Sequence, residues 1–470
     1  MPITRREVAF GAVIGGAGLA AKAQPPPAWV TPDDETIRRI LIERIDTQKD
    51  GVAAVVGVVD AAGRRFVSYG PRSKAAPAPV DADTVFEIGS MTKVFTSLLL
   101  ALAVQRGEVT LDEPIQKLLP ASVHAPERNG HQITLIDLAT HTSGLPRLPT
   151  NLKPKDPLNP YADYTVEDLY AFLNGYQLTR DPGSHYEYSN LGGGLLGHLL
   201  ARRAGADYET LVRTRITGPL GMTSTAITLT PALRARMAQG YTAALEPTPN
   251  WDLPTLAGAG ALRSTAADIA TFLAAELGFK PTPLKAAMEA QLAPRRPGPA
   301  PNMQTALAWL ISSIRGRQIV WHNGGTGGFR TFMGFDPQAR VGVVVMTNAA
   351  TSRGGDDIGL HLLSGYPLMP APPPRSIHHE ITLPPEALQA FVGQYDFAPT
   401  ASVFVTRDGD QLFAQLTGQG KARIFPETAN NFFYKIVDAQ LTFERGPDGR
   451  VTGLVLHQSG RTLRAVRVES

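Results

Sequence analysis

The chain has 470 residues, 43% apolar and 19% charged, a composition typical of a soluble globular protein with two or three domains. The net charge is only +3, and no run of Lys and Arg is interleaved with aromatic residues, which argues against a nucleic-acid partner. Cysteine is absent, so disulfides, thiolate metal sites and a cysteine nucleophile are excluded.

Residues 1–23 have the features of a secretory signal peptide. Arg5 and Arg6 precede an apolar run that ends at Ala21, and Ala21-Lys22-Ala23 is a small-x-small cleavage site. The paired arginines and the weakly apolar, glycine-containing run resemble a twin-arginine signal, but arginine pairs are also common in general secretory (Sec) signals, so both types remain open. The run is too short for a stable membrane span. We therefore expect a periplasmic or secreted protein; the alternative is an uncleaved interfacial helix or a disordered tail.

Residues 24–369 are predicted to form one α+β domain, because strand patterns occur at both of its ends and helical patterns lie between them. The expected architecture is an antiparallel sheet flanked by helices, with a helical lobe beside it. Helices are predicted at 35–48, from Ser90 to about 107, and at 166–173, 191–204, 264–277 and 354–365. Strands are predicted at 52–59, 64–69, 306–314, 318–322, 329–335 and 341–346.

Residues 370–379 read as a proline-rich linker, and residues 380–470 as a small all-β domain. Short alternating runs predict strands at 402–407, 411–416, 432–434, 441–444, 451–457 and 462–467. Asp-Gly and Ser-Gly pairs between these runs are typical of hairpin turns. We expect a barrel, of lipocalin type, whose function the sequence does not indicate.

The first chemical motif is Ser90-Met91-Thr92-Lys93 at the start of a predicted helix. A spacing of three places both side chains on one helix face. A serine hydroxyl needs a base, and a buried lysine that loses its charge can act as one. The helix N-terminus also directs backbone N–H groups toward a developing oxyanion. Taken alone, the motif is equally well explained as an ordinary helix start.

A second motif, Tyr188-Ser189-Asn190, precedes another predicted helix. A tyrosine close to a serine can relay its proton, and the asparagine can hold a substrate amide and the lysine amine. The same residues also suit a helix N-cap.

The third motif is His322-Asn323-Gly324-Gly325 at the end of a predicted strand. Glycines there allow another backbone or a ligand to approach closely. The strand edge is expected to pair with the substrate backbone and to offer the Gly325 N–H as an oxyanion donor. In isolation, the motif also fits a glycine-rich hairpin.

In this order, the three motifs resemble those of the serine β-lactamases and penicillin-binding proteins. The Tyr-x-Asn motif points to class C β-lactamases and to their D-alanyl-D-alanine carboxypeptidase, D-aminopeptidase and esterase relatives. Phe86-Glu87-Ile88-Gly89 and the run from His141 to Pro146 agree with this family. The resemblance covers about residues 35–365, and His141 is interpreted as structural.

The resemblance implies that Ser90 is the acyl-enzyme nucleophile, that Lys93 and Tyr188 share proton transfer, and that Asn190 positions the substrate. It leaves open whether Lys93 or Tyr188 is the general base. Neither a metal nor a cofactor is expected.

For substrate binding, the resemblance implies an oxyanion hole made by the N–H groups of Ser90 and Gly325. His322, Asn323 and Gly324 would contact the substrate, which we expect to be a small molecule or a cell-wall peptide.

One departure from the family lies in the third motif, where class C β-lactamases carry Lys-Thr-Gly. A lysine keeps a permanent positive charge for a substrate carboxylate, whereas a histidine such as His322 is mostly neutral at pH 7. We expect hydrolysis of β-lactam or D-amino-acid peptide bonds through an acyl-enzyme, without strong penicillinase activity. The alternatives are a carboxylesterase of the same family and a penicillin-binding sensor that is acylated without turnover.

Overall fold

The computed structural model describes residues 29–372, 378–397, 401–417, 420–458 and 461–468. The predicted signal peptide, part of the predicted linker and the predicted Ser459-Gly460 turn lie outside the described residues.

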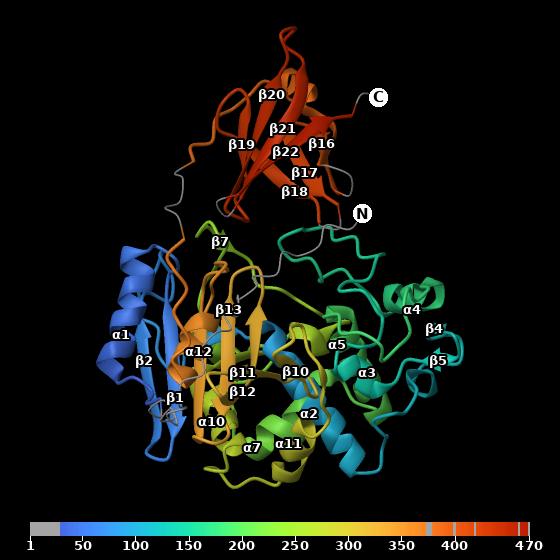
Figure 1. Cartoon of the computed structure of the whole chain (residues 1–470), viewed down its shortest axis with the longest axis vertical. Coiled ribbons are helices and arrows are strands. Elements are labelled where there is room, and N and C mark those ends of the chain that lie inside the picture. Colours follow the sequence, from blue (N-terminus) through green and yellow to red (C-terminus); the bar gives the residue numbers. More distant parts are fainter. Residues whose placement is uncertain (1–28, 373–377, 398–400, 418–419, 459–460, 469–470) are drawn as a thin grey trace, which may run out of the picture. The chain divides into compact units, whose positions relative to one another are not determined.

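An antiparallel sheet of eight strands forms the centre of the first large domain (Figure 1). Its order is β2-β1-β14-β13-β12-β11-β10-β9, so β1 pairs with β14 and the two ends of the domain sequence meet inside one sheet. The strands are β1 (Ala54–Asp60), β2 (Gly63–Tyr69), β9 (Arg296–Pro297), β10 (Met303–Thr305), β11 (Leu310–Ile314), β12 (Arg317–Gly325), β13 (Arg330–Asp336) and β14 (Val341–Thr347). The predicted sheet built from both ends is confirmed.

Helices cover both faces of this sheet (Figure 1). Because side chains alternate along a strand, Val56 and Val58 of β1 face α1 (Asp34–Ile42) and α12 (Asp356–Ser364). Val55 and Val59 face the opposite core, which is built with α2 (Thr92–Gln105), α10 (Ala266–Glu276) and α11 (Lys285–Leu292). The chain therefore has two apolar layers, one on each side of the sheet.

The helical lobe lies between the two parts of the sheet sequence, as predicted. Its helices are α3 (Leu135–Ala139), α4 (Val166–Gly175), α5 (Asn190–Ala204), α6 (Tyr208–Val212), α7 (Gly218–Leu220), α8 (Pro231–Ala235) and α9 (Ala257–Gly260). Short pairs complete it: β3 (Val85–Glu87) with β8 (Arg263–Thr265), β4 (Glu127–Arg128) with β5 (His131–Gln132), and β6 (Gly240–Tyr241) with β7 (Pro247–Thr248).

The prediction of one continuous strand over 306–314 is wrong. The chain turns between β10 and β11, where the N–H of Ala306 donates to the carbonyl of Trp309 at 2.8 Å. Ala308 in this turn has a φ of 64°. Ala306 to Trp309 are all buried, so their apolar character reflects burial in a turn rather than strand structure.

The C-terminal domain is a closed antiparallel barrel in which β15 pairs with both β16 and β22. Its strands are β15 (Gly393–Phe397), β16 (Ala401–Asp408), β17 (Gln411–Leu416), β18 (Ala422–Pro426), β19 (Asn431–Phe433), β20 (Ala439–Arg445), β21 (Val451–Gln458) and β22 (Arg461–Arg467), preceded by α13 (Pro385–Leu388). The predicted barrel is confirmed, and β15 and β18 are strands that the sequence patterns did not reveal. Large buried side chains such as Tyr395, Phe432 and Phe443 fill its core.

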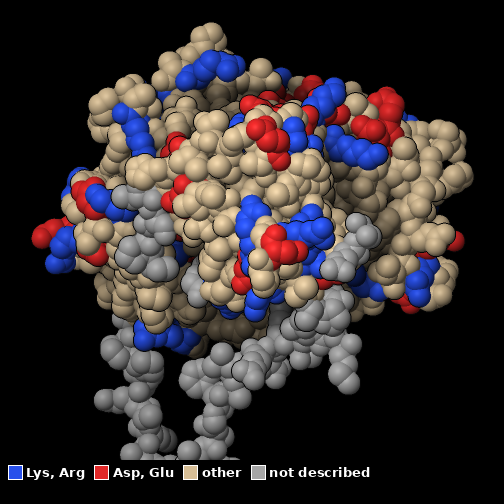
Figure 2. Space-filling view, turned by 90° about the horizontal axis from the view of Figure 1, so that it is seen from above, with Lys and Arg blue, Asp and Glu red and all other residues tan. Residues whose placement is uncertain are grey.

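On the face of the molecule in Figure 2, basic and acidic side chains are interspersed, as the small net charge leads one to expect. No helix among the described residues is long and apolar enough to cross a bilayer.

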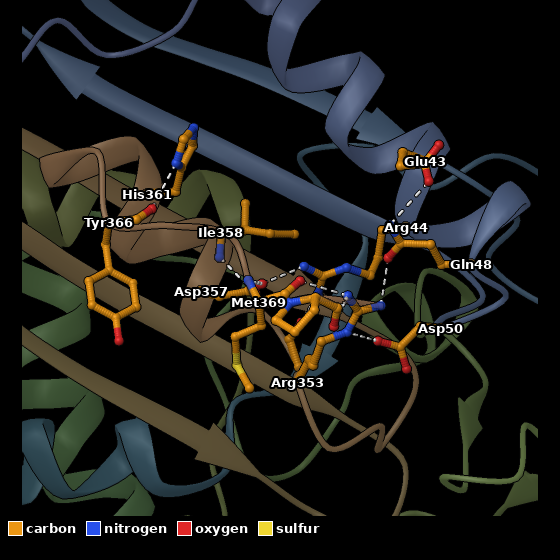
Figure 3. A network of polar contacts seen from close by, with 12 residues as sticks. Glu43, Arg44, Gln48, Asp50, Arg353, Asp357, Ile358, His361, Tyr366 and Met369 are labelled. Carbon is orange, nitrogen blue, oxygen red and sulfur yellow. Dashed lines mark hydrogen bonds and ion pairs between the residues drawn. The ribbon is translucent and has the colours of Figure 1, made fainter. Parts of the chain in front are cut away.

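Two buried ion pairs join the segment that follows α1 to α12 and to the loop before it. Figure 3 shows Arg44 directed at Asp357 and Arg353 directed at Asp50, both at 2.6 Å. The Asp357 carboxylate also accepts the N–H of Met369 at 2.9 Å. The network therefore fixes the start of the domain, α12 and the segment that follows it to one another.

We expect Asp357→Ala to lower the free energy of unfolding by about 3–5 kcal/mol, because Arg44 would remain buried without its counter-charge. Urea denaturation at pH 7 would measure this. The matched control is Glu289→Ala, which removes the exposed pair with Lys285 and should cost less than about 1 kcal/mol. Equal effects of the two variants would contradict the structural role of the buried pair.

Candidate active site

Ser90 lies in a single 3₁₀ turn, Gly89–Met91, that leads directly into α2. Gly89 has a φ of +50°, and a Cβ at this position would lie only 2.6 Å from the backbone nitrogen of Gly325. The nucleophile turn and the end of β12 are therefore in backbone contact. Glycine at position 89 permits both the positive φ and this approach.

Lys93 is buried one turn after Ser90 and is 2% exposed. Its Nζ lies 3.0 Å from Ser90 Oγ, 2.9 Å from Asn190 Oδ1 and 2.7 Å from the carbonyl oxygen of Ala259. Gly193 of α5 makes room for this side chain, since a Cβ there would lie 2.8 Å from Lys93 Cε. Burial, and next the positive charge of Arg147, hold the pKa of Lys93 well below 10.5.

These contacts define what each protonation state of Lys93 does. The oxygens of Asn190 and Ala259 only accept hydrogen bonds, so a neutral amine donates both of its hydrogens to them and directs its lone pair at the Ser90 hydroxyl. An ammonium group instead donates its third proton to Ser90 Oγ. The neutral form is therefore oriented to act as a general base.

The phenol of Tyr188 is a second titratable group beside Ser90, whose hydroxyl acts on its pKa. Burial raises the pKa of Tyr188, whereas the Ser90 hydrogen bond and the charge of Arg147 oppose this rise. The ring packs against His141 at a tilt of 36° with centroids 4.4 Å apart, and Lys93 Nζ lies 4.9 Å from its centroid. His141 Nδ1 accepts the N–H of Ser189 at 3.2 Å, so this histidine supports the Tyr188 ring, in agreement with a structural role.

Asn190 begins α5, and Ser189 is the N-cap, its side chain accepting the N–H of Gly192 at 2.8 Å. The Asn190 side chain is held from both ends, because Oδ1 accepts from Lys93 and Nδ2 donates to Tyr161 Oη at 3.1 Å. In this motif, Ser189 therefore caps α5 while Asn190 contacts Lys93 in the site.

The end of β12 has one free edge. β11 pairs with β12 only as far as Trp321, whereas β13 pairs with it through Gly325. Backbone groups of residues 322–325 on the β11 side are therefore available to an extended substrate. Gly324 contacts the nucleophile turn, since a Cβ there would lie 1.9 Å from the carbonyl oxygen of Ile88.

His322 is buried, and its ring centroid lies 6.5 Å from that of Tyr188. Nδ1 donates to the carbonyl of Asn323 at 2.6 Å, so Nε2 is the acceptor nitrogen of the neutral ring. Burial and then the charge of Lys93 lower the pKa of His322 to about 4. His322 is therefore uncharged at neutral pH.

Asn323 points to the opposite face of the strand, where its Nδ2 donates to Asp356 Oδ2 at 2.5 Å. Only the backbone of Asn323 remains on the substrate edge. Burial raises the pKa of Asp356 to about 6, against the effect of the Asn323 hydrogen bond.

Sequence patterns did not identify Tyr161 and Arg147, which also line this site. Tyr161 holds Asn190, and its ring lies 5.4 Å from that of Trp251. The Arg147 guanidinium lies 5.1 Å from the centroid of the Tyr188 ring. The position of Arg147 directly after the His141–Pro146 run is the one sequence signal that would have found it.

Activity on a neutral ester should rise with pH along an acid limb with a midpoint well below 10.5, because the amine form of Lys93 accumulates as pH passes its lowered pKa. kcat/KM profiles would measure this. The midpoint should persist in His322→Asn, since His322 is neutral above about pH 4. A limb at 10.5, or one lost in His322→Asn, would contradict the assignment.

Residues 37–364 match the β-lactamase family. The D-alanyl-D-alanine-carboxypeptidase/endopeptidase AmpH of Escherichia coli (strain K12) is 30% identical to this chain over 389 residues, which cover 78% of this chain and 99% of that protein. The chain belongs to the β-lactamase family. This family consists of hydrolases of the serine β-lactamase and DD-peptidase type.

Solved structures agree with this β-lactamase fold. A β-lactamase/D-alanine carboxypeptidase from Yersinia pestis, complexed with citrate, superimposes with a TM-score of 0.60 at 27% identity over 67% of this chain and 92% of that one. An octameric penicillin-binding protein homologue from Pyrococcus abyssi has a TM-score of 0.61 at 20% identity, covers 93% of this chain and 100% of that one, and shows likeness of fold alone. Residues 378–467 match a domain of unknown function, DUF3471.

Among the described residues, the structure brings together Ser90, Lys93, Tyr188, Asn190, His322 and Gly325, and it turns the Asn323 side chain away. In the same ranges, no cluster of three or more His, Cys, Asp or Glu could hold a metal ion. The side chains that meet at this site offer a hydroxyl, an amine and a phenol.

Proposed function

We propose that the protein hydrolyses β-lactam or D-amino-acid peptide amide bonds through an acyl-enzyme on Ser90. The observation that carries this proposal is the 3.0 Å contact between Lys93 Nζ and Ser90 Oγ beside the open edge of β12. AmpH, a D-alanyl-D-alanine carboxypeptidase and endopeptidase, supports this choice of substrate.

In the proposed reaction, Ser90 Oγ attacks the carbonyl carbon while its proton passes to the Lys93 amine or to Tyr188. The N–H groups of Ser90 and Gly325 stabilise the resulting oxyanion. The leaving amine takes up the proton as the carbon–nitrogen bond breaks. Water then attacks the Ser90 ester with help from the same base, and the carboxylic acid is released.

A carboxylesterase is the second candidate, and the neutral state of His322 favours it. Because the third motif carries no permanent cation, it gives a substrate with a carboxylate little advantage in binding over a neutral substrate. A non-turnover penicillin-binding sensor is the third, and it shares the acylation step.

Parallel kinetics with nitrocefin, an N-acyl-D-Ala-D-Ala peptide and p-nitrophenyl acetate would test the proposal. We expect turnover of the peptide or the β-lactam in addition to the ester. Turnover of the ester alone would establish the esterase instead. A burst followed by a long-lived adduct on Ser90, seen by intact-protein mass spectrometry, would establish the sensor.

We also propose that the protein is exported to the periplasm or beyond, because residues 1–23 have a signal-peptide pattern. N-terminal sequencing of the protein from the periplasmic fraction should find cleavage after Ala23. An intact N-terminus in the cytoplasmic fraction would contradict export.

A further inference from the structure

The described site contains a cation that the third motif does not supply. His322 is uncharged at neutral pH, so the strand edge offers no permanent positive charge to a substrate. Arg147 lies beside Tyr188, 5.1 Å from the ring centroid, and its side chain is exposed. Arg147 therefore supplies a permanent positive charge from the helical lobe.

Backbone hydrogen bonds fix the position of Arg147. Its carbonyl accepts the N–H of Asn190 at 2.9 Å and that of Leu191 at 3.3 Å, and the preceding Pro146 carbonyl accepts the Ser189 hydroxyl at 2.6 Å. The loop that carries Arg147 is thus bonded to the start of α5, where Asn190 contacts Lys93. Arg147 belongs to the rigid frame of the site rather than to a free surface loop.

The guanidinium of Arg147 is unneutralised. Within the described parts of the chain, it has no hydrogen-bond or ion-pair partner, and the neighbouring Glu187 is paired with Arg180. The charge that acts on Lys93 comes from Arg147, which is a permanent cation. A site with an unpaired positive charge is complementary to an anion.

We propose that Arg147 is a specificity-determining residue that binds a carboxylate of the substrate at the mouth of the site. This inference rests on the proposed function. A planar guanidinium with five donors suits a carboxylate, to which it makes two parallel hydrogen bonds. The charge of Arg147 also acts on the phenols of Tyr161, Tyr186 and Tyr188.

A different role for Arg147 would be to tune the base. Its charge lowers the pKa of Lys93 and opposes the rise in the pKa of Tyr188. Such an effect acts on every substrate alike, whereas carboxylate binding changes the preference between an acid and its neutral analogue. The ratio of kcat/KM for the acid to kcat/KM for its neutral analogue therefore separates the two roles.

The test compares kcat/KM for two matched pairs: N-acetyl-D-Ala-D-Ala with its C-terminal amide, and benzylpenicillin with its methyl ester. We expect the acid-over-neutral ratio to fall about 10- to 100-fold in Arg147→Ala, the range for a lost hydrogen bond to a charged group. Arg147→Lys should keep part of the preference for the acid, and Arg147→Glu should reverse it in favour of the neutral analogues. A change confined to one pair identifies which carboxylate Arg147 binds.

Arg106→Ala is the control for charge. Arg106 is exposed at the C-terminal end of α2, about 24 Å from Ser90 along the helix, and its removal should leave both ratios unchanged. Equal ratios in Arg147→Ala and wild type would overturn the inference while leaving the proposed function in place. If no substrate or penicillin probe acylates Ser90 in the wild type, the proposed function itself fails.

Discussion

A Ser90→Ala variant should form no covalent adduct with a fluorescent penicillin and should lose roughly 10⁴-fold or more of kcat/KM, because the reaction then has no nucleophile. The fold should persist, since the substitution removes one hydroxyl whose partners are Lys93 and Tyr188. Gel fluorescence and intact-protein mass spectrometry would measure labelling, and thermal melting would verify folding.

Ser184→Ala is the matched control for labelling. Ser184 is an exposed serine whose hydroxyl donates to the carbonyl of Asp181, so its loss should leave the adduct at wild-type levels. Labelling of a folded Ser90→Ala protein would show that another residue is the nucleophile.

Gly89→Ala is expected to reduce kcat/KM by about 10²- to 10³-fold, the effect of losing one oxyanion donor. The new Cβ would lie 2.6 Å from the nitrogen and 2.9 Å from the oxygen of Gly325, so the end of β12 must move away from Ser90. Lys93 and Ser90 remain in contact because both lie on the α2 side of this clash. Steady-state kinetics with the preferred substrate would measure the loss.

Gly107→Ala separates this clash from backbone strain alone. Gly107 also has a positive φ, +66°, but a Cβ there would meet nothing within 4 Å. This control should lose about 1 kcal/mol of stability and keep its activity. If both variants were equally active, the contact between Gly89 and Gly325 would not support the oxyanion hole.

Sequence alone was sufficient to predict those secondary-structure elements whose pattern lies within a short stretch of chain. The β1–β2 hairpin and the helix after Ser90 follow from residues close together in the chain, and each was predicted within a few residues. Motif order was enough to nominate Ser90, Lys93, Tyr188 and Asn190. Both motifs lie at the starts of helices, so they can be found from residues that are close together in the chain, without knowledge of distant packing.

The barrel shows where local patterns failed. β18 is a short run, Ala422–Pro426, that pairs with β17 on one side and β19 on the other. Its strand state comes from backbone pairing with both neighbouring strands of the barrel, which requires no clear alternating pattern. The same dependence on packing made Ala306–Trp309 a buried turn rather than a strand.

Tertiary structure alone decided the electrostatics of the site. The charge state of His322 depends on burial and on Lys93, which lies far from it in the sequence. Arg147 reaches Tyr188 only because its loop is bonded to the start of α5, and Asn323 turns away from the substrate because β12 alternates its side chains. The sequence thus nominated the groups that are proposed to carry the chemistry. Folding determined their protonation and neighbours, because a pKa depends on all the charges and solvent that the fold places around a group.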